Sequence, residues 1–552
     1  MNTAVEQTIG FKIRRAILEN WGRPALTEYT VETVTYGELG RQIARVHAQL
    51  AAVGVKPGDR VALIGRSTIG WAAVYFGVVT YGAVIVPILN DFKGSTVNHI
   101  VNHSEAKVFY VAESHWEALG ESSMPNVEAF ISVGTGRILY SKQKEVAARD
   151  WGIPAMEKAD FEALPIRYTT GEELAEINYT SGTTGFSKGV MQPFRSLESN
   201  VQFAEGVIPV QPGDTVISVL PLAHAYGQAF EFLYCFTRGC HIHFISKTPS
   251  PKVIAQAFAE IKPRIILIVP LIMEKIYKQH ILKQLNRRGM RLLMRAPVIG
   301  ERVKRKFCDA LSGFFGDNFL EVIIGGAALN PEVELFLKRI GFRYTVGYGM
   351  TECAPIITYA SWDTHRLHST GRVVVNMELR INEPNSETGV GEVVVRGKNV
   401  MLGYYRDPAL TEEVFTPDGW LRTGDLAYLD AEGNLFIKGR SKNMILGPSG
   451  QNIYPEEVEA VLNSQPYIQE SLVAEQDGKL VALVVPDFVN ASADGVPIDV
   501  LEARFEEVRK AVNKELPAYS QIAAIQLYPE EFEKTPKKSI KRFMYALNPL
   551  KH

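Results

Sequence analysis

Cysteine is scarce in this sequence. Only four cysteines occur among 552 residues, at Cys235, Cys240, Cys308 and Cys353, and they form no CxxC pair accompanied by histidines. A disulfide framework or a structural zinc site needs closely spaced or paired thiols, so both are disfavoured. The cysteine content therefore fits a reducing cytoplasm, which is the location that we expect.

A strong excess of one charge is also missing. Lysine and arginine number 59 against 61 acidic residues, which gives a formal net charge of -2. Nonspecific binding to nucleic acid is driven by a basic field, so we expect no nucleic-acid partner. Hydrophobic residues make up 46% and charged residues 22% of the chain, as in ordinary globular proteins. A chain of this length predicts two or more domains.

No long hydrophobic run is free of interruptions. The longest uncharged run, Ser67–Asn90, has the length of a membrane span but contains Gly77 and Pro87. We therefore predict a buried helix followed by a buried strand at Ala83–Ile88. Residues Met1–Arg15 lack the apolar core and small-residue cleavage site of a secretory signal, so we expect none.

Apolar strands alternate with helix-length segments through most of the chain. The hydrophobic pattern predicts a helix at Tyr36–Val53 and a strand at Val61–Ile64. This alternation is typical of a parallel sheet covered by helices, so the predicted fold class is α/β with a large layered N-terminal body. The pattern continues in predicted strands at Thr215–Val219, His241–Ile245, Ile265–Val269 and Glu321–Ile324.

The pattern changes beyond about Gly391. Short strands with turn residues between them, including the turn Asp430–Gly433, predict a β-rich subdomain. The C-terminal part combines helices and strands and predicts a small α+β domain. The predicted elements are strands Glu392–Arg396, Leu426–Leu429 and Asn434–Ile437, then helices Pro455–Leu462 and Leu501–Glu515 with strands Leu472–Ala474 and Leu480–Val485.

One segment, Lys275–Lys306, is strongly basic. It holds eleven lysine or arginine residues against the single acidic residue Glu301. Apolar residues such as Leu292 and Val298 lie between the charges, so the segment could form an amphipathic surface that contacts the inner face of a membrane. A solvated basic face on helices that pack on the core explains the same pattern, and both interpretations stay open.

The most informative segment is Tyr179–Gly189, which reads YTSGTTGFSKG. Its glycines let backbone N–H groups converge, and its hydroxyl and lysine side chains can donate hydrogen bonds to phosphate oxygens. It differs from the GxxxxGK[ST] loop because Lys188 is followed by glycine. By itself the segment is either a phosphate-binding loop or a flexible surface loop. The candidate phosphate-binding residues are Thr180, Ser181, Gly182, Thr183, Thr184 and Lys188.

This segment resembles the signature TSGTTGxPKG of the adenylate-forming superfamily, which includes acyl-CoA synthetases, firefly-type luciferases and peptide-synthetase adenylation domains. The chain departs from the signature at Ser187, where proline is usual. Further matching segments follow in the family's order, from about Tyr36 to Arg542. The resemblance implies a large N-terminal domain for ATP and the acid, residues 1–441, and a small mobile C-terminal domain, residues 442–552.

Two segments resemble the family's motifs around the acyl pocket. The segment Pro221–His224 looks like PLxH, which implies that His224 lies between the acyl pocket and the thiol tunnel. Without this context, a lone histidine beside apolar residues is more often a core residue. The segment GGAAL resembles the one that lines adenine and the acyl pocket, which implicates Gly326 and Ala327, because small residues let a backbone approach a flat purine.

Two more motifs imply a nucleotide and metal site. The segment YGMTE matches the family's YGxTE, so that Tyr348 stacks on adenine, Thr351 contacts phosphate and Glu352 binds Mg²⁺, a role that suits a carboxylate oxygen. Without the motif, Glu352 would be an ordinary exposed carboxylate. The segment WLRTGD matches [WY]xxTGD, and the two oxygens of Asp425 can accept hydrogen bonds from both ribose hydroxyls.

The resemblance extends into the expected small domain. Gly439–Lys442 resembles the GRx[DK] hinge, with Arg440 near the ribose and Lys442 at the pivot. The segment that begins at Gly450 resembles GxNxxPxEVE, which lines the pantetheine tunnel once the small domain has rotated. Gly450 is therefore a candidate for contact with coenzyme A.

One motif departs from the family at its main residue. The adenylation lysine normally comes from KTxxGKIxR, but this chain reads KTPKKSIKR and has Ser539 at the lysine position. A hydroxyl cannot replace an ammonium as a point charge on phosphate. Lys538 or Lys541 reaches the site by a local shift, or adenylation is slow. We predict that Lys538 takes the role.

The implied reaction needs ATP, Mg²⁺ and coenzyme A. The acid attacks the α-phosphorus to give acyl-AMP and pyrophosphate, and a thiol then attacks the mixed anhydride. The segment Val269–Tyr277 with the basic insertion after it resembles the long-chain fatty acyl-CoA synthetases, which favours a medium- or long-chain fatty acid. The alternatives are a ligase that loads a carrier-protein phosphopantetheine and a non-catalytic nucleotide or acyl-CoA binding protein. The oligomeric state is left undetermined.

Overall fold

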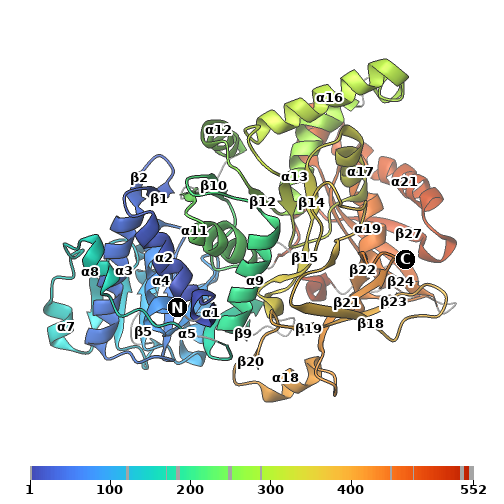
Figure 1. Cartoon of the computed structure of the whole chain (residues 1–552). Coiled ribbons are helices and arrows are strands. Elements are labelled where there is room, and N and C mark those ends of the chain that lie inside the picture. Colours follow the sequence, from blue (N-terminus) through green and yellow to red (C-terminus); the bar gives the residue numbers. More distant parts are fainter. Residues whose placement is uncertain are drawn as a thin grey trace.

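An eight-stranded sheet forms the centre of the N-terminal region (Figure 1). The computed structural model describes residues 3–119, 123–169, 171–181, 187–245, 251–285, 289–447, 451–476, 478–534 and 540–545. Its inner strands are parallel, and antiparallel strands close both edges. The strand order is β20 (Gly403–Tyr404), β9 (Ser187–Pro193), β8 (Leu174–Ser181), β4 (Val84–Ile88), β3 (Arg60–Ile64), β5 (Val108–Val111), β6 (Ala129–Ser132) and β7 (Ile138–Ser141).

Helices α3 (Tyr36–Val53) and α4 (Ile69–Tyr81) pack on each other beside this sheet. α3 has the predicted bounds, because Thr35 and Glu38 form a capping box at its start and Gly54 ends it in the left-handed conformation. α4 is buried on all sides, which confirms the predicted buried helix between two strands. Within the described residues, no helix combines the length and apolar character that crossing a bilayer requires.

Two further sheets continue the layered body. The first has the order β10 (Thr215–Ser218), β11 (His241–Phe244), β1 (Pro24–Glu28) and β2 (Glu32–Thr35). The second is parallel and contains β12 (Ile266–Ile268), β13 (Val322–Ile324) and β14 (Tyr344–Val346). A parallel bridge between Val216 and Ile265 connects the two sheets. All four strands that the sequence predicted here are therefore confirmed, and the fold class is α/β.

The second of these sheets has its own hydrophobic core. Helices α12 (Pro251–Ile261), α16 (Pro297–Phe314) and α17 (Pro331–Ile340) contribute buried side chains to it. Phe307 and Leu311 of α16 are among them. The basic segment is thus helical for most of its described length and is anchored on the body through one face.

A β-rich module follows, as the sequence predicts. It contains a small sheet of β15 (Tyr348–Gly349), β16 (Ile356–Tyr359) and β17 (Arg372–Val373). Beside it, an antiparallel sheet has the order β18 (Met377–Asn382), β19 (Gly391–Gly397), β21 (Leu421–Leu429) and β22 (Leu435–Arg440). Strand β21 begins at Leu421 rather than at the predicted Leu426, so the TGD segment lies within a strand.

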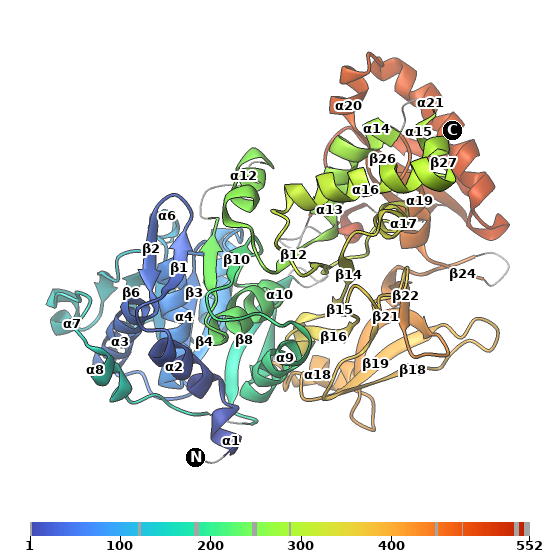
Figure 2. The ribbon, with the colours of Figure 1, turned by 45° about the horizontal axis from the view of Figure 1, so that its top comes forward.

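The C-terminal part forms a small α+β unit beside this module (Figure 2). After the short pair β23 (Ile445–Leu446) and β24 (Asn452–Ile453), helix α19 (Pro455–Asn463) leads into a three-stranded sheet. That sheet contains β25 (Ile468–Gln476), β26 (Lys479–Pro486) and β27 (Ile522–Leu527), with helices α20 (Phe488–Ala493) and α21 (Ile498–Glu515). It has a separate hydrophobic core, in which Val458, Leu462 and Phe505 take part.

Candidate active site

Three side chains from separate motifs meet at the edge of the β-rich module. Asp425 and Arg440 lie directly opposite each other on the antiparallel strands β21 and β22. The Arg440 Nε atom lies 2.9 Å from Asp425 Oδ1, and the Tyr348 hydroxyl donates to Asp425 Oδ2 at 2.6 Å. The fold thus joins the YGMTE, TGD and GRSK segments in a single cluster.

The Asp425 carboxyl group is almost fully buried, whereas the Arg440 side chain is more than half exposed. Burial raises the pKa of Asp425, and the nearby Arg440 guanidinium opposes that rise. The charge of Asp425 in turn raises the pKa of Arg440. A carboxylate offers about four acceptor positions, so Asp425 still has capacity for two more hydroxyl donors after binding Tyr348 and Arg440. A ribose cis-diol is a ligand that this capacity would fit.

The phosphate-loop candidate is the connection of an antiparallel hairpin. Thr180 near the end of β8 pairs with Lys188 near the start of β9, and Ser181 pairs with Ser187. Gly182, Thr183 and Thr184 lie outside the described residues. The hairpin brings Thr180 and Lys188 to the same end of the sheet, at the base of the connecting segment.

Tyr404 connects this hairpin with the YGMTE segment. It lies in β20, which pairs with β9. The Tyr404 hydroxyl donates to Glu352 Oε1 at 2.9 Å, and the Lys188 Nζ atom lies 5.3 Å from the centre of the Tyr404 ring, within range of a cation–π contact. The sequence motifs gave no indication of Tyr404, because it follows no periodic pattern and meets Glu352 only in the folded chain.

The backbone beside Glu352 is also tied to the hairpin. The Gln192 side-chain amide of β9 donates to the Thr351 carbonyl oxygen, and the Met401 N–H donates to the Glu352 carbonyl oxygen at 2.9 Å. These bonds fix Thr351 and Glu352 next to the phosphate-loop candidate. Within the described residues, no hydrogen bond or ion pair engages Glu352 Oε2.

The residues present fit a Mg²⁺ ion that is held together with phosphates. Mg²⁺ in nucleotide sites is commonly bound by one or two carboxylates plus substrate phosphates and water. Glu352 supplies such a carboxylate. Among the described residues, no group of three or more histidine, cysteine, aspartate or glutamate side chains could hold a metal by protein ligands alone.

The fold also brings the PLAH and GGAAL segments together. The Tyr226 N–H donates to His224 Nδ1 at 3.3 Å, and the Tyr226 hydroxyl donates to the Ile323 carbonyl oxygen at 3.0 Å. A Cβ atom added at Gly325 would lie 3.2 Å from the Tyr226 ring. Tyr226, which follows His224 by two residues, therefore connects the PLAH segment with Gly325. Gly326 has a φ of +88°, a conformation that favours glycine, and Ala327 is exposed.

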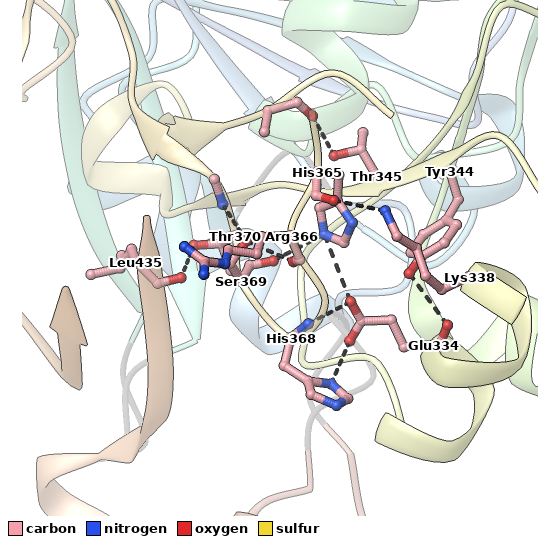
Figure 3. A network of polar contacts seen from close by, with 12 residues as sticks. Glu334, Lys338, Tyr344, Thr345, His365, Arg366, His368, Ser369, Thr370 and Leu435 are labelled. Atoms are coloured by element: carbon pink, nitrogen blue, oxygen red, sulfur yellow. Dashed lines mark hydrogen bonds and ion pairs between the residues drawn. The ribbon is translucent and has the colours of Figure 1, made fainter. Parts of the chain in front are cut away.

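Helix α17 starts directly after the GGAAL segment and is held by a polar network (Figure 3). Glu334 accepts hydrogen bonds from the His368 N–H at 2.8 Å and from His368 Nδ1 at 3.0 Å. The Lys338 Nζ atom donates to the His365 carbonyl oxygen at 2.9 Å. Burial lowers the pKa of His365 and the nearby Glu334 charge opposes this. The network fixes the helix that follows Gly326 and Ala327.

The N-terminus of α17 contacts the C-terminal unit. Asn330 Oδ1 caps the helix by accepting from the Glu332 N–H at 2.9 Å. Its Nδ2 atom donates to the Ala460 carbonyl oxygen at 3.2 Å and to the Ser464 hydroxyl at 3.0 Å. Nearby, the half-buried Lys278 donates to the Ile468 carbonyl oxygen at 3.1 Å. These contacts join the N-terminal body to the C-terminal unit.

Of the remaining predicted residues, Lys442 and Lys541 lie within the described chain. Lys442 is exposed in a short 3₁₀ turn (Ser441–Asn443) that follows Arg440 directly. Gly450, Lys538 and Ser539 lie outside the described residues. The Lys541 Nζ atom lies 3.2 Å from Glu533 Oε2, so the alternative lysine forms an ion pair within the C-terminal unit.

Comparison with known families identifies the family of the chain. Residues 13–405 match the model of the AMP-binding enzyme family, and residues 442–546 match the model of the AMP-binding enzyme C-terminal domain. The chain belongs to the AMP-binding enzyme family. The family resemblance expected from the motifs is therefore confirmed.

Two curated proteins are similar to this chain over most of its length. The chain is 29% identical over 470 residues to a long-chain-fatty-acid–CoA ligase, FadD15, of Mycobacterium bovis, covering 80% of this chain and 75% of that one. It is 24% identical to a long-chain-fatty-acid–[acyl-carrier-protein] ligase, AEE15, of Arabidopsis thaliana, covering 90% and 77% respectively. Both similarities extend over most of each chain.

A solved structure supports the AMP-binding fold. The o-succinylbenzoate coenzyme A synthetase MenE of Bacillus subtilis, in complex with ATP and a magnesium ion, superposes with a TM-score of 0.73 at 22% identity. The alignment covers 96% of this chain and 98% of that one. The similarity therefore includes the large body and the C-terminal unit.

Proposed function

We propose that this AMP-binding enzyme activates a medium- or long-chain fatty acid with ATP and transfers the acyl group to coenzyme A. The observation that carries the proposal is the meeting of Tyr348, Asp425 and Arg440 beside the hairpin that holds Lys188. This arrangement supplies an acceptor for a ribose diol next to a candidate phosphate loop and a carboxylate at Glu352. The long-chain relative supports the fatty acid, and the AMP-binding family supports the ATP chemistry.

In the first step, an oxygen of the acid attacks the α-phosphorus, and the bond to pyrophosphate breaks. Asp425 holds the ribose, while Thr180, Lys188 and Thr351 bind the phosphates and stabilise the charge that develops there. Glu352 would hold Mg²⁺, which supplies further neutralisation of that charge when bound. Tyr348 and Gly326 flank the adenine in this proposal.

In the second step, a thiol sulfur attacks the acyl carbonyl carbon, the thiol proton passes to solvent, and AMP leaves. We place the division between the two domains at residues 441 and 442, with Lys442 as the pivot. The C-terminal family model, which starts at residue 442, supports this position. Rotation about the pivot would bring Gly450 toward the incoming thiol. His224 would lie between the acyl and thiol sides.

The proposal also places the enzyme in the cytoplasm. All four cysteines are free, as expected in a reducing compartment. The similarity to FadD15, named a long-chain-fatty-acid–CoA ligase, favours coenzyme A as acceptor, and the similarity to AEE15, named an acyl-carrier-protein ligase, makes phosphopantetheine on a carrier protein the second candidate. A non-catalytic binding protein is a third candidate because of Ser539.

Pyrophosphate release with acids from acetate to stearate tests the first step. We expect turnover to rise with chain length, and activity confined to acetate or to aromatic acids would overturn the choice of substrate. Competition between coenzyme A and a phosphopantetheine carrier protein then identifies the acceptor. Absence of ATP turnover with every acid would favour the non-catalytic alternative.

The variant Asp425→Asn tests whether this cluster is the active site. Loss of charge-assisted hydrogen bonds worth about 2 kcal/mol should raise KM for ATP roughly thirtyfold. Asp418→Asn is the matched control, because Asp418 is exposed and lies outside the cluster. Its Oδ2 atom lies 2.9 Å from the Arg380 guanidinium. Equal KM values for ATP in both variants would contradict the assignment of Asp425 to the active site.

A further inference from the structure

Four large apolar side chains are exposed close together in the basic segment. Leu292 is 73% exposed, Leu293 41%, Val298 70% and Ile299 55%. They belong to the short helix α15 (Met290–Leu293) and to the first turn of α16. No other stretch of similar length in the described chain exposes as many large apolar residues. Such a group is unfavourable in water, so it marks a contact surface.

The opposite face of these helices is fixed on the protein. Phe307 and Leu311 of α16 are buried in the second hydrophobic core, and Met290 and Met294 pack against it. The exposed apolar side chains are therefore not part of an unfolded or loosely attached segment. They project from helices that are held in place. α16 lies along the upper edge of the molecule in Figure 1, and Figure 2 turns that edge toward the viewer.

Arginines share the outward face of α16 with these apolar residues. Val298, Arg302 and Arg305 follow one another at the spacing that places helical residues on one face. Arg302 and Arg305 are exposed, and within the described residues neither forms an ion pair. Lys304, by contrast, lies 2.7 Å from Glu301. The outward face thus combines apolar side chains with uncompensated positive charge.

We propose that the patch formed by Leu292, Leu293, Val298, Ile299, Arg302 and Arg305 docks the protein on a bilayer that contains anionic lipids. Apolar side chains that enter the headgroup region and arginines that reach lipid phosphates form the two parts of an interfacial membrane contact. The charge of the patch is opposite to that of such a surface. The whole chain has a net charge of -2, so the local patch rather than the overall charge would orient the protein.

The structure thereby favours one of the two interpretations of the basic segment. A merely solvated basic face would place charges outward and apolar residues inward. Here the core-facing positions are filled by other apolar residues, such as Phe307, while Val298 and Ile299 remain in solvent. A protein partner would need an acidic and apolar surface of matching shape, and no observation on this chain specifies one. An anionic bilayer needs only these two properties.

Vesicle sedimentation with the full-length protein tests the proposal. The probes are vesicles of phosphatidylcholine mixed with phosphatidylglycerol and vesicles of phosphatidylcholine alone. The wild type should bind the anionic vesicles more strongly, and added salt should weaken this binding. Arg302→Glu with Arg305→Glu should weaken this binding by at least a hundredfold, because two attractive charges are lost and two repulsive charges are gained.

The apolar part is tested by Leu292→Ser, Val298→Ser and Ile299→Ser in one chain. All three positions are exposed, so the fold should tolerate the changes. The apolar control replaces two residues that are exposed elsewhere, Ile153 and Val489, by serine. The matched charge control, Arg137→Glu with Lys144→Glu, changes the net charge equally at exposed positions outside the patch. Both controls should bind anionic vesicles like the wild type.

Each outcome tests the proposed membrane contact independently of the enzyme reaction. Reduced vesicle binding in the patch variants alone, with unchanged acid-dependent turnover without vesicles, supports the proposal. No binding by the wild type, or equal losses in patch and control variants, overturns it. A molecular mass in solution that halves in the patch variants, without vesicle binding by the wild type, would show a contact between copies of the chain and also overturn it.

Discussion

Tyr404 lies between two side chains that the sequence motifs single out. Its hydroxyl donates to Glu352, and its ring faces the Lys188 ammonium. Glu352 and Lys188 were predictable because each lies in a recognisable segment. Tyr404 was not, because its contact depends on the pairing of β20 with β9, which no local pattern reveals. We therefore expect Tyr404 to act as a positioning residue for Glu352.

The variant Tyr404→Phe should raise the Mg²⁺ concentration needed for half-maximal pyrophosphate release several-fold. Loss of a hydrogen bond to a charged group, worth about 1.5 kcal/mol or more, leaves Glu352 less well oriented. KM for the acid should not change. The adjacent Tyr405→Phe is the control. An unaltered Mg²⁺ dependence in Tyr404→Phe would contradict the positioning role.

A buried carboxyl group, that of Glu231, lies against the residues just before the PLAH segment. Glu231 accepts hydrogen bonds from the Ser218 hydroxyl at 2.9 Å and from the Leu220 N–H at 3.2 Å. It lies in a π-helical stretch, η2 (Gln228–Tyr234), just after the His224 turn. Burial raises the pKa of Glu231 from 4.5 to about 8. The sequence could not predict this burial, because glutamate is usually exposed.

Glu231 should therefore make stability depend on pH. Because the pKa of Glu231 is raised in the folded state, its contribution to folding stability is complete below pH 4.5. This contribution is lost as pH rises through about 8. Stability should fall across this window by up to about 1.4 kcal/mol per pH unit. Glu231→Gln should flatten the pH dependence of the thermal midpoint. The exposed Glu507→Gln is the control, and parallel curves for wild type and Glu231→Gln would refute the assignment.

At the scale of elements, local sequence signals predicted the bounds of helices better than the bounds of strands. The Thr35 and Glu38 capping box and Gly54 gave α3 its correct bounds. Strand β21 was predicted too short, because Arg422–Asp425 contains polar residues and a glycine, which are disfavoured in strands. Pairing of Leu421 and Arg422 with β19 holds this polar stretch in the sheet. Tertiary pairing therefore overrides local preference here.

Two variants of Asn330 separate its role as the cap of helix α17 from its contact with the C-terminal unit. Asn330→Asp keeps the Oδ1 acceptor for the cap and for the Ser464 hydroxyl but removes the Nδ2 donor to the Ala460 carbonyl oxygen. Asn330→Ala removes both and should cost about 1 kcal/mol of stability for the cap. We expect faster hydrogen exchange in α19 for both variants, but a lower thermal midpoint only for Asn330→Ala. Unchanged exchange in Asn330→Asp would show that the contact does not hold the unit.

At the scale of the whole molecule, the arrangement of the two domains determines which lysine reaches the adenylation site. We predict that Lys538→Ala lowers ATP–pyrophosphate exchange roughly a hundredfold, because one ammonium that stabilises the phosphate charge is lost. Lys541→Ala is the control, since Lys541 pairs with Glu533. Ser539→Lys, which restores the family's residue, should rescue exchange in Lys538→Ala. Unchanged exchange in Lys538→Ala would sink the assignment.

The sequence by itself determined the layered α/β body, the β-rich module, the C-terminal unit and the motif segments of the candidate site. These features depend on hydrophobic periodicity and on short motifs, which are local along the chain. Only the tertiary structure decided that Tyr348 meets Asp425 across 77 residues, that Tyr404 reaches Glu352, and that Val298 and Ile299 face solvent. Such contacts follow from strand pairing and helix packing between distant segments, and no local pattern encodes them.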